Sequence, residues 1–217
     1  MAMRIWLVRH AEPDYRRDTI TEVGKRQAQA LAKVLARERI DRLFVSPFGR
    51  AQATAAEIVG HLGVQMQTLS WLGELNGNWT GNRWAWDDDV SVVALFTAKI
   101  PELSDWHKVV PYGSLLLPQW RHLVQQFDAL LAEFGYIRAG TVYQVHRDSD
   151  AHLVFVTHAG VILTLLSHLL NWALPLVYVH VPCDVASITE LCWHKRDGYA
   201  VPKLIRINDT AHWQKGD

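Results

Sequence analysis

Two arginines and two histidines fall at or just after the ends of short apolar runs, and together they suit phosphate chemistry. Arg9 and His10 close the first apolar run of the chain, and His158 follows the apolar residues 152–157. Arg50 lies one turn into a helix expected after a third such run. An imidazole nitrogen can accept a phosphoryl group, and a guanidinium can bind phosphoryl oxygens through two parallel hydrogen bonds. The residue types therefore indicate a nucleophile and a binding set for a phosphoryl group.

A phosphoryl transfer to imidazole also needs an acid that protonates the departing alkoxide. Glu74 is the candidate, because it lies between Trp71 and Trp79 in a segment rich in apolar and aromatic residues. Burial among such neighbours raises the pKa of a carboxyl group and keeps it protonated. The alternative is an ordinary solvated carboxylate, which is how we interpret the three aspartates at 87–89.

Each of these residues also has an interpretation without catalysis. Arg9 and His10 can belong to a surface turn, and Arg50 can be a solvated charge on a helix. His158 can be a core histidine that caps a helix. We favour a site because all of them stand where a strand is expected to give way to a helix. Backbone N–H groups at the starts of two helices, the one expected after Ser46 and the one that begins at Ala159, would add donors for an anion.

The elements that must position these residues alternate between strand and helix. Short apolar runs predict buried strands at 3–8, 42–45 and 152–157, and helices are expected between them. This alternation favours a parallel sheet with covering helices. In such a sheet the carboxyl ends of the strands form one crevice, where ligands bind. The candidate residues would therefore converge.

Two helix starts can be placed from local signals. Thr19 and Glu22 have the spacing of a capping box, which predicts that a helix begins there. Ser46 as N-cap, with Pro47 at the first helical position, predicts a second helix that extends to about Gly60. The residues expected on the buried face of the first helix are Ala28, Leu31, Ala32 and Leu35.

Residues 70–113 break the alternation and are expected to form a cap-like excursion over the active site of a single domain that spans 1–217. The tryptophans of this segment could stack on a substrate ring or could pack the excursion onto the sheet; they are Trp79, Trp84, Trp86 and Trp106. The later elements are expected to be a helix over 114–134 that ends at Gly135, an apolar helix after residue 160, and strands at 187–193 and 203–207.

Composition excludes several classes of partner. The formal net charge is zero, from 22 basic and 22 acidic residues, which argues against nucleic-acid and membrane-surface binding. No apolar run reaches the about 18 residues of a membrane span, and we see no signal peptide, so we expect a cytoplasmic protein. Cys183 and Cys192 do not make a disulfide framework. No metal-ligand spacing is present, so we expect neither a metal nor another cofactor.

Several segments, taken in order, resemble the motifs of the histidine phosphatase superfamily, which includes cofactor-dependent phosphoglycerate mutases and many small phosphatases. The segments cover most of the chain: Leu7–Glu12, Ile20–Gly24 with Gln27-Ala28, Val45–Pro47 with Arg50-Ala51 and Thr54-Ala55, Val156–Val161, Ser187–Leu191 and Ile207–His212. The resemblance implies a three-layer α/β/α fold with a mostly parallel central sheet, like that of phosphoglycerate mutase.

The resemblance also implies roles for the candidate residues. His10 would be the phosphorylated nucleophile, and Glu74 would be the proton donor. Arg9, Arg50 and His158 would bind the phosphate and stabilise the charge on the transferring group, with His158 part of the catalytic set. The two arginines would take the place of the metal ions that other phosphoryl-transfer sites use.

The residues after the nucleophile favour a phosphatase over a mutase. Mutase-type members continue with Gly-Glu-Ser, whereas this chain has Ala11, Glu12 and Pro13, and proline offers neither a hydroxyl nor a backbone N–H. We therefore predict a metal-independent phosphomonoesterase that acts through a phosphohistidine on a small phosphorylated metabolite. The alternatives are a cofactor-dependent phosphoglycerate mutase and a catalytically silent module that binds a phosphorylated ligand or a protein. The oligomeric state is left open.

Overall fold

The apolar runs of the sequence become the middle of an eight-stranded sheet. The computed structural model describes residues 2–77, 84–86, 102–108 and 112–213. The strands of the sheet are β1 (Arg4–Arg9), β4 (Arg42–Val45), β5 (Met66–Thr68), β6 (Tyr136–Ala139), β7 (Val142–Val145), β8 (His152–Thr157), β9 (Ile188–Arg196) and β10 (Tyr199–Asp209). Two further strands, β2 (Pro13–Asp14) and β3 (Thr19–Ile20), form a small separate hairpin.

The sheet is mixed, with order β5-β4-β8-β1-β9-β10-β7-β6. β5, β4, β8 and β1 run parallel, and the half from β9 to β6 pairs antiparallel. In the parallel half Arg9 pairs with Thr157, and Val45 pairs with Val156. The carboxyl ends of three neighbouring strands are therefore level, and the residues that follow them start from one edge.

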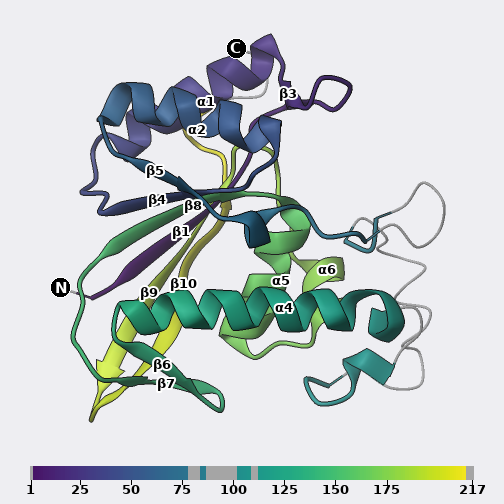
Figure 1. Cartoon of the computed structure of the whole chain (residues 1–217), viewed down its shortest axis with the longest axis vertical. Coiled ribbons are helices and arrows are strands. Elements are labelled where there is room, and N and C mark those ends of the chain that lie inside the picture. Colours follow the sequence, from purple (N-terminus) through teal and green to yellow (C-terminus); the bar gives the residue numbers. More distant parts are fainter. Residues whose placement is uncertain (1, 78–83, 87–101, 109–111, 214–217) are drawn as a thin grey trace.

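Helices cover both faces of the sheet, which confirms the predicted three-layer α/β/α fold (Figure 1). α1 and α2 lie on one face, and α4, α5 and α6 lie on the other (Figure 1). Their bounds are α1 (Glu22–Leu35), α2 (Gly49–Leu62), α4 (Tyr112–Glu133), α5 (Ala159–Leu170) and α6 (Leu174–His180), with short 3₁₀ turns η1 (Ser70–Leu72) and η2 (Trp106–Lys108). None of the helices that the structure describes is long and apolar enough to cross a membrane.

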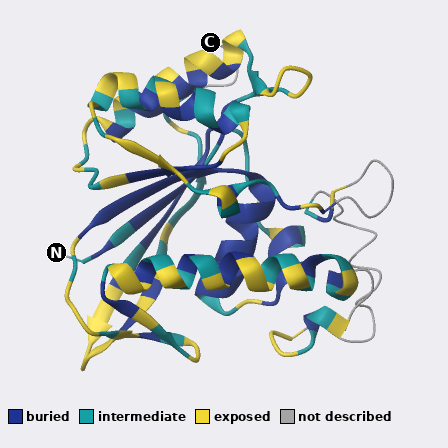
Figure 2. Cartoon of the chain, in the orientation of Figure 1, coloured by how far each residue is buried: buried dark blue, intermediate teal, exposed yellow. Residues whose placement is uncertain are grey.

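The central strands are buried on both faces, so alternate side chains along each strand pack into two different cores (Figure 2). From β1, Ile5 and Leu7 join the core under α4 and α5, whereas Trp6 and Val8 join the core under α1 and α2. Burial on both faces explains why these strands appear in the sequence as continuous apolar runs without alternation.

The two predicted helix starts were each wrong by two residues. α1 is capped by Thr21, whose Oγ1 accepts a hydrogen bond from the amide of Gly24, while Thr19 pairs within the β2–β3 hairpin. α2 begins at Gly49 with Phe48 as its N-cap, and the hydroxyl of Ser46 contacts His158 and accepts from the amide of Phe48, before the helix begins. Both shifts accompany contacts with residues of neighbouring elements.

The later elements are longer than predicted and include a hairpin that the sequence did not indicate. β9 and β10 extend beyond 187–193 and 203–207, because they form one long antiparallel pair. β6 and β7 add a second antiparallel pair at the sheet edge. The helix predicted over 114–134 is confirmed as α4, and Gly135 follows it with a φ of +92°.

The predicted excursion over 70–113 falls largely outside the described residues, as do Trp79 and Asp87–Asp89 within it. Its role as a cap stays a prediction. Within the described part, Trp106 is buried and packs its ring edge against Trp120, so this tryptophan belongs to the core.

Candidate active site

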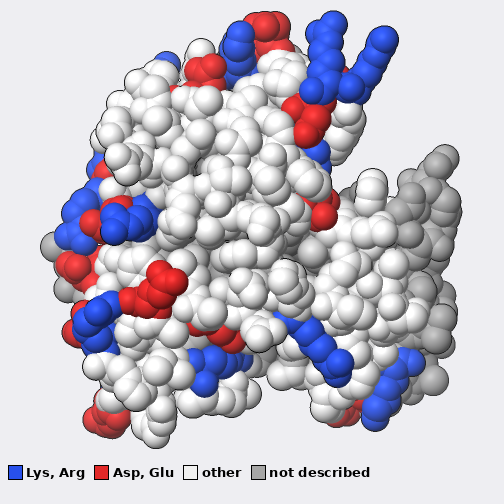
Figure 3. Space-filling model, in the orientation of Figure 1, with Lys and Arg blue, Asp and Glu red and all other residues white. Residues whose placement is uncertain are grey.

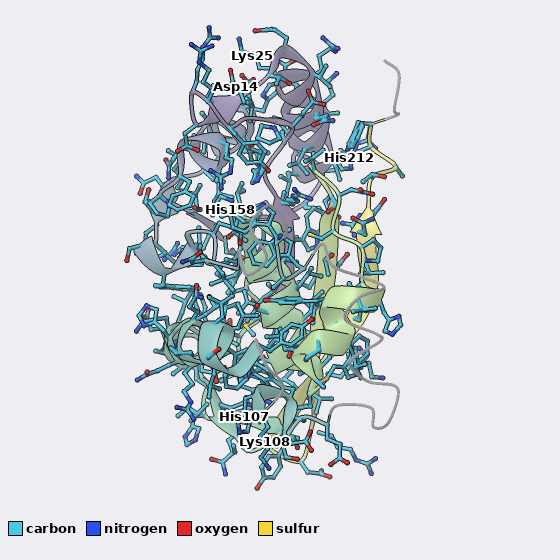
Figure 4. The ribbon with its side chains drawn as sticks, turned by 90° about the vertical axis from the view of Figure 1, so that its right-hand side faces the viewer. Asp14, Lys25, His107, Lys108, His158 and His212 are labelled. Atoms are coloured by element: carbon cyan, nitrogen blue, oxygen red, sulfur yellow. The ribbon has the colours of Figure 1, made fainter. Side chains whose placement is uncertain are left out.

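The level ends of the parallel strands bring the predicted residues together. Arg9 is the last residue of β1, His10 follows it, and His158 is the N-cap of α5 directly after β8. The rings of His10 and His158 are 5.1 Å apart between centroids. Arg50, the second residue of α2, donates from Nε to His10 Nε2 at 3.3 Å. Figure 4 places His158 above α5, between the upper and lower helical layers.

The surroundings of His10 fix both its tautomer and its charge. Its Nδ1 lies 2.8 Å from the backbone carbonyl of Ala11, which assigns the ring proton to Nδ1 and leaves a lone pair on Nε2. Burial lowers the pKa of His10 to about 3, and the charges of Arg9 and Arg50 add to this effect. The imidazole is therefore neutral near pH 7, which is the form that can attack phosphorus.

His158 is also held neutral behind His10. Burial lowers its pKa to about 2, and His10 and the two arginines add to the effect. Its Nε2 lies 2.7 Å from Ser46 Oγ, which also accepts from the amide of Phe48. If the serine gives its one proton to Nε2, the histidine proton is on Nδ1. That nitrogen is buried and has no hydrogen-bond partner among the described residues.

Arg50 is positioned by the loop that joins β2 and β3. Asp18 Oδ1 accepts from the guanidinium at 2.7 Å, while its Oδ2 accepts from the amide of Gly49 at 2.7 Å. The guanidinium also lies over the rings of Tyr15, at 5.4 Å, and Phe48, at 5.0 Å. A Cβ on Gly49 would fall 1.9 Å from the carbonyl oxygen of Asp18, so this approach requires glycine. Asp18 was not predicted from the sequence, because no local motif marks it.

Arg9 is held by a backbone carbonyl. Its guanidinium donates to the carbonyl oxygen of Cys183, in the segment before β9. Its Nε is buried and has no hydrogen-bond partner within the described chain. The side chain therefore retains a donor for another acceptor.

Glu74 lies at the N-terminus of α5. Its Oε1 accepts from the amide of Leu75 at 3.0 Å, and its Oε2 accepts from the amide of Gly160 at 3.3 Å. The surrounding protein desolvates the carboxyl group and raises its pKa to about 7. A carboxyl group with this pKa is partly protonated at neutral pH and can both donate and accept a proton.

The helix N-termini expected to bind an anion are engaged by carboxylates of the protein. The amide of Gly160 in α5 donates to Glu74, and that of Gly49 in α2 donates to Asp18. Ala159 begins α5 and is buried. Ala159 is not among the residues that line the cavity described next, so its part in phosphate binding stays a prediction.

A cavity of about 490 Å³ opens over these groups. It is lined by Arg9, His10, Tyr15, Phe48, Arg50, Glu74, Leu75, Asn76, Trp84 and Trp86. Figure 3 shows the molecule hollowed below the end that carries β3, with basic and acidic side chains interspersed over the visible face. Four of the predicted site residues thus face one cavity, and the ring of His158 lies against that of His10, which is one of the four.

Two polar side chains hold the segment after His10. Thr54 Oγ1 accepts from the amide of Ala11 at 3.0 Å, and Gln27 Oε1 accepts from the amide of Glu12 at 2.8 Å. These contacts tie the end of β1 to both α1 and α2. Over the residues that the structure describes, no group of three or more His, Cys, Asp or Glu side chains is placed to hold a metal ion.

Comparison with known proteins agrees with this geometry. The family model described as "Histidine phosphatase superfamily (branch 1)" matches residues 5–91. An adenosylcobalamin/alpha-ribazole phosphatase of Salmonella typhimurium is 26% identical, over 98% of this chain and 99% of that protein.

Solved structures share the fold. A mycobacterial glucosyl-3-phosphoglycerate phosphatase in complex with inorganic phosphate has a TM-score of 0.66 and 24% identity, over 98% of this chain and 100% of that one. A phosphoserine phosphatase mutant of Entamoeba histolytica in complex with phosphoserine has a TM-score of 0.65 and 19% identity, with the same shares covered.

Proposed function

We propose that the chain is a member of the histidine phosphatase superfamily and a metal-independent phosphomonoesterase that forms a phosphohistidine at His10. One observation carries the proposal. The Nε2 lone pair of a neutral His10 faces a cavity whose lining also holds Arg9, Arg50 and Glu74. A nucleophile, two cations and a titratable acid are the groups that this reaction needs.

In the first step, Nε2 of His10 attacks the phosphorus of a bound monoester. A phosphoryl oxygen takes over the Nε–H of Arg50 that now points at His10 Nε2, which frees the lone pair. The N–P bond forms as the ester P–O bond breaks, and Glu74 transfers its proton to the departing alcohol oxygen. Arg9 Nε and His158 Nδ1, which are buried and unpartnered in the described chain, bind the remaining phosphoryl oxygens.

In the second step, water attacks the phosphohistidine. Glu74, now a carboxylate, takes a proton from the water as its oxygen bonds to phosphorus. The N–P bond breaks, His10 returns to its neutral form, and inorganic phosphate leaves. The arginine charges stabilise the transferring group in both steps, the role that metal ions have at other phosphoryl-transfer sites.

Trapping of the intermediate tests this proposal. Wild-type protein is mixed with a radiolabelled phosphomonoester in EDTA and quenched in alkali, where phosphohistidine survives. We expect label on the wild type, no label on His10→Ala, and label on the control His194→Ala, which changes an exposed histidine of β9. Turnover of a phosphomonoester by His10→Ala at the wild-type rate would contradict the proposal.

The same assays separate the alternatives. Conversion of 3-phosphoglycerate to 2-phosphoglycerate with a trace of bisphosphoglycerate, at a rate above hydrolysis, would identify a mutase. Absence of turnover for every phosphomonoester would favour the silent binding module. The curated relative is named for alpha-ribazole phosphate hydrolysis, and that reaction class, hydrolysis of a small phosphorylated metabolite, is the one we propose here.

A further inference from the structure

Two stacked tryptophans form the wall of the cavity beside Glu74. The rings of Trp84 and Trp86 are 5.4 Å apart between centroids and 14° from parallel. Trp86 packs close to Gly160: a Cβ there would fall 2.6 Å from Trp86 Cζ3 and 2.7 Å from Glu74 Oε1. Since both groups crowd the same point, the indole of Trp86 and the carboxyl of Glu74 are neighbours.

The position of Glu74 determines where the alcohol part of a substrate lies. The carboxyl group must reach the ester oxygen that departs, so the alcohol begins beside Glu74 and therefore beside Trp86. Trp84, which is 41% exposed, continues the stack toward solvent. We therefore expect the alcohol part to lie along these two rings.

The charges of the cavity restrict that alcohol part further. Among the described lining residues the cations are Arg9 and Arg50, and both lie at His10, where the phosphoryl group binds. The aromatic rings of Tyr15 and Phe48, over which the Arg50 guanidinium lies, complete this part of the lining. Within the described lining, a carboxylate on the alcohol would lose its hydration and find no cation besides the two arginines at the phosphoryl group.

We propose that Trp84 and Trp86 form a stacking subsite for an uncharged, planar aromatic group on the alcohol part of the substrate. This inference rests on the proposed function of the same site. A cavity of about 490 Å³ has room for such a group beyond the phosphate. A planar ring system laid on Trp84 and Trp86 extends the stack, and the subsite disfavours phosphate esters of hydroxy acids.

Matched substrates test the stacking. Benzyl phosphate and cyclohexylmethyl phosphate both release a primary alcohol and differ in ring aromaticity. We expect kcat/KM to favour benzyl phosphate by about 3- to 10-fold. This ratio should fall toward one in Trp84→Leu and persist in Trp84→Phe. The control Trp172→Leu changes a tryptophan of similar exposure, 44%, outside the cavity lining, and should keep the ratio.

A second pair tests the charge. Glycerol 3-phosphate and 3-phosphoglycerate both release a primary alcohol, and the second carries a carboxylate. We expect a lower kcat/KM for 3-phosphoglycerate. A benzyl-to-cyclohexylmethyl ratio near one in the wild type, an unchanged ratio in Trp84→Leu, or a preference for 3-phosphoglycerate would each overturn the subsite while leaving the phosphatase intact. If none of the four esters is hydrolysed, this result would instead overturn the proposed function, and the subsite with it.

Discussion

At the residue scale, the site contains titratable groups whose surroundings move their pKa values in opposite directions. Burial and two arginines lower the pKa of His10 to about 3, whereas desolvation raises the pKa of Glu74 to about 7. Near neutral pH the imidazole is therefore unprotonated, while a large fraction of the carboxyl group keeps its proton. This separation suits a nucleophile and an acid that act in the same step.

Glu74→Gln tests the acid. We expect kcat/KM for benzyl phosphate to fall about 10²- to 10⁴-fold, because an alkoxide leaves poorly without a proton. The loss should be much smaller with 4-nitrophenyl phosphate, whose phenolate leaves without one. The parameter kcat/KM is used because it reports the step that forms the phosphohistidine.

The pH profile provides a second readout for Glu74. In the wild type, kcat/KM for benzyl phosphate should decline above about pH 7, as Glu74 loses its proton. This decline should be absent from Glu74→Gln. Equal losses on both substrates, with an unchanged alkaline limb, would show that Glu74 does not protonate the leaving group.

At the element scale, the N-terminus of α5 determines the position of the Glu74 carboxyl group. Its residue Gly160 donates an amide hydrogen to Glu74 and leaves room for the ring of Trp86. α5 itself is fixed by β8, since His158 joins strand and helix directly. Gly160, which in the sequence is one residue of a short motif, thus determines the spacing between α5 and the side chains of Glu74 and Trp86.

Gly160→Ala tests this arrangement. The new methyl group would fall within 2.6–2.7 Å of Trp86 and Glu74, so both must move. We expect kcat/KM for benzyl phosphate to fall about 10-fold or more, because small displacements of an acid slow proton transfer strongly. The alkaline limb of the pH profile should shift as well.

Gly60→Ala is the matched control, because Gly60 lies within α2 and a Cβ there has nothing within 4 Å among the described atoms. It should stabilise the protein by about 0.5–1 kcal/mol and leave kcat/KM unchanged. Wild-type kinetics in Gly160→Ala would refute the positioning role of the glycine.

At the scale of the whole molecule, the mixed sheet separates two cores, and several histidines are buried without charge in or beside them. Burial lowers the pKa of His10 to about 3, of His158 to about 2 and of His152 to about 4. Each of these rings is protonated near pH 6 in the unfolded chain but stays neutral in the folded one. Acid therefore stabilises the unfolded state.

We expect the free energy of unfolding to decrease as the pH falls from about 6.5 toward 4. The unfolded chain then binds more protons than the folded chain. Each histidine therefore lowers the free energy of unfolding by at most about 1.4 kcal/mol for each pH unit. Glu74 acts in the opposite direction, since its raised pKa contributes stability that is lost as the pH rises through about 7. Three histidines outweigh one carboxyl group in this window.

Urea unfolding between pH 7.5 and 4.5 measures the slope. His152→Leu replaces a buried histidine that lies outside the cavity lining, and it should flatten the pH dependence of the free energy of unfolding. His194→Leu, at an exposed position, should not. Equal slopes for His152→Leu and the wild type would rule out a contribution of His152.

The sequence by itself determined the parallel half of the sheet and the residues at its edge. The strands predicted at 42–45 and 152–157 match β4 and β8, and the strand predicted at 3–8 matches β1 within one residue. Such strands can be predicted because a segment buried on both faces is a continuous apolar run. The level ends of parallel strands then bring Arg9, His10 and His158 to one place.

Only the tertiary structure decided how those residues are held. Arg50 is oriented by Asp18, Ser46 contacts His158, and Gly160 faces Trp86. The first two pairs are separated by 32 and 112 residues, and the third pair joins positions 86 and 160 of the sequence. No local sequence pattern predicts these contacts. Apolar periodicity reports burial along one segment, whereas a hydrogen bond between distant segments exists only after the sheet has brought them together.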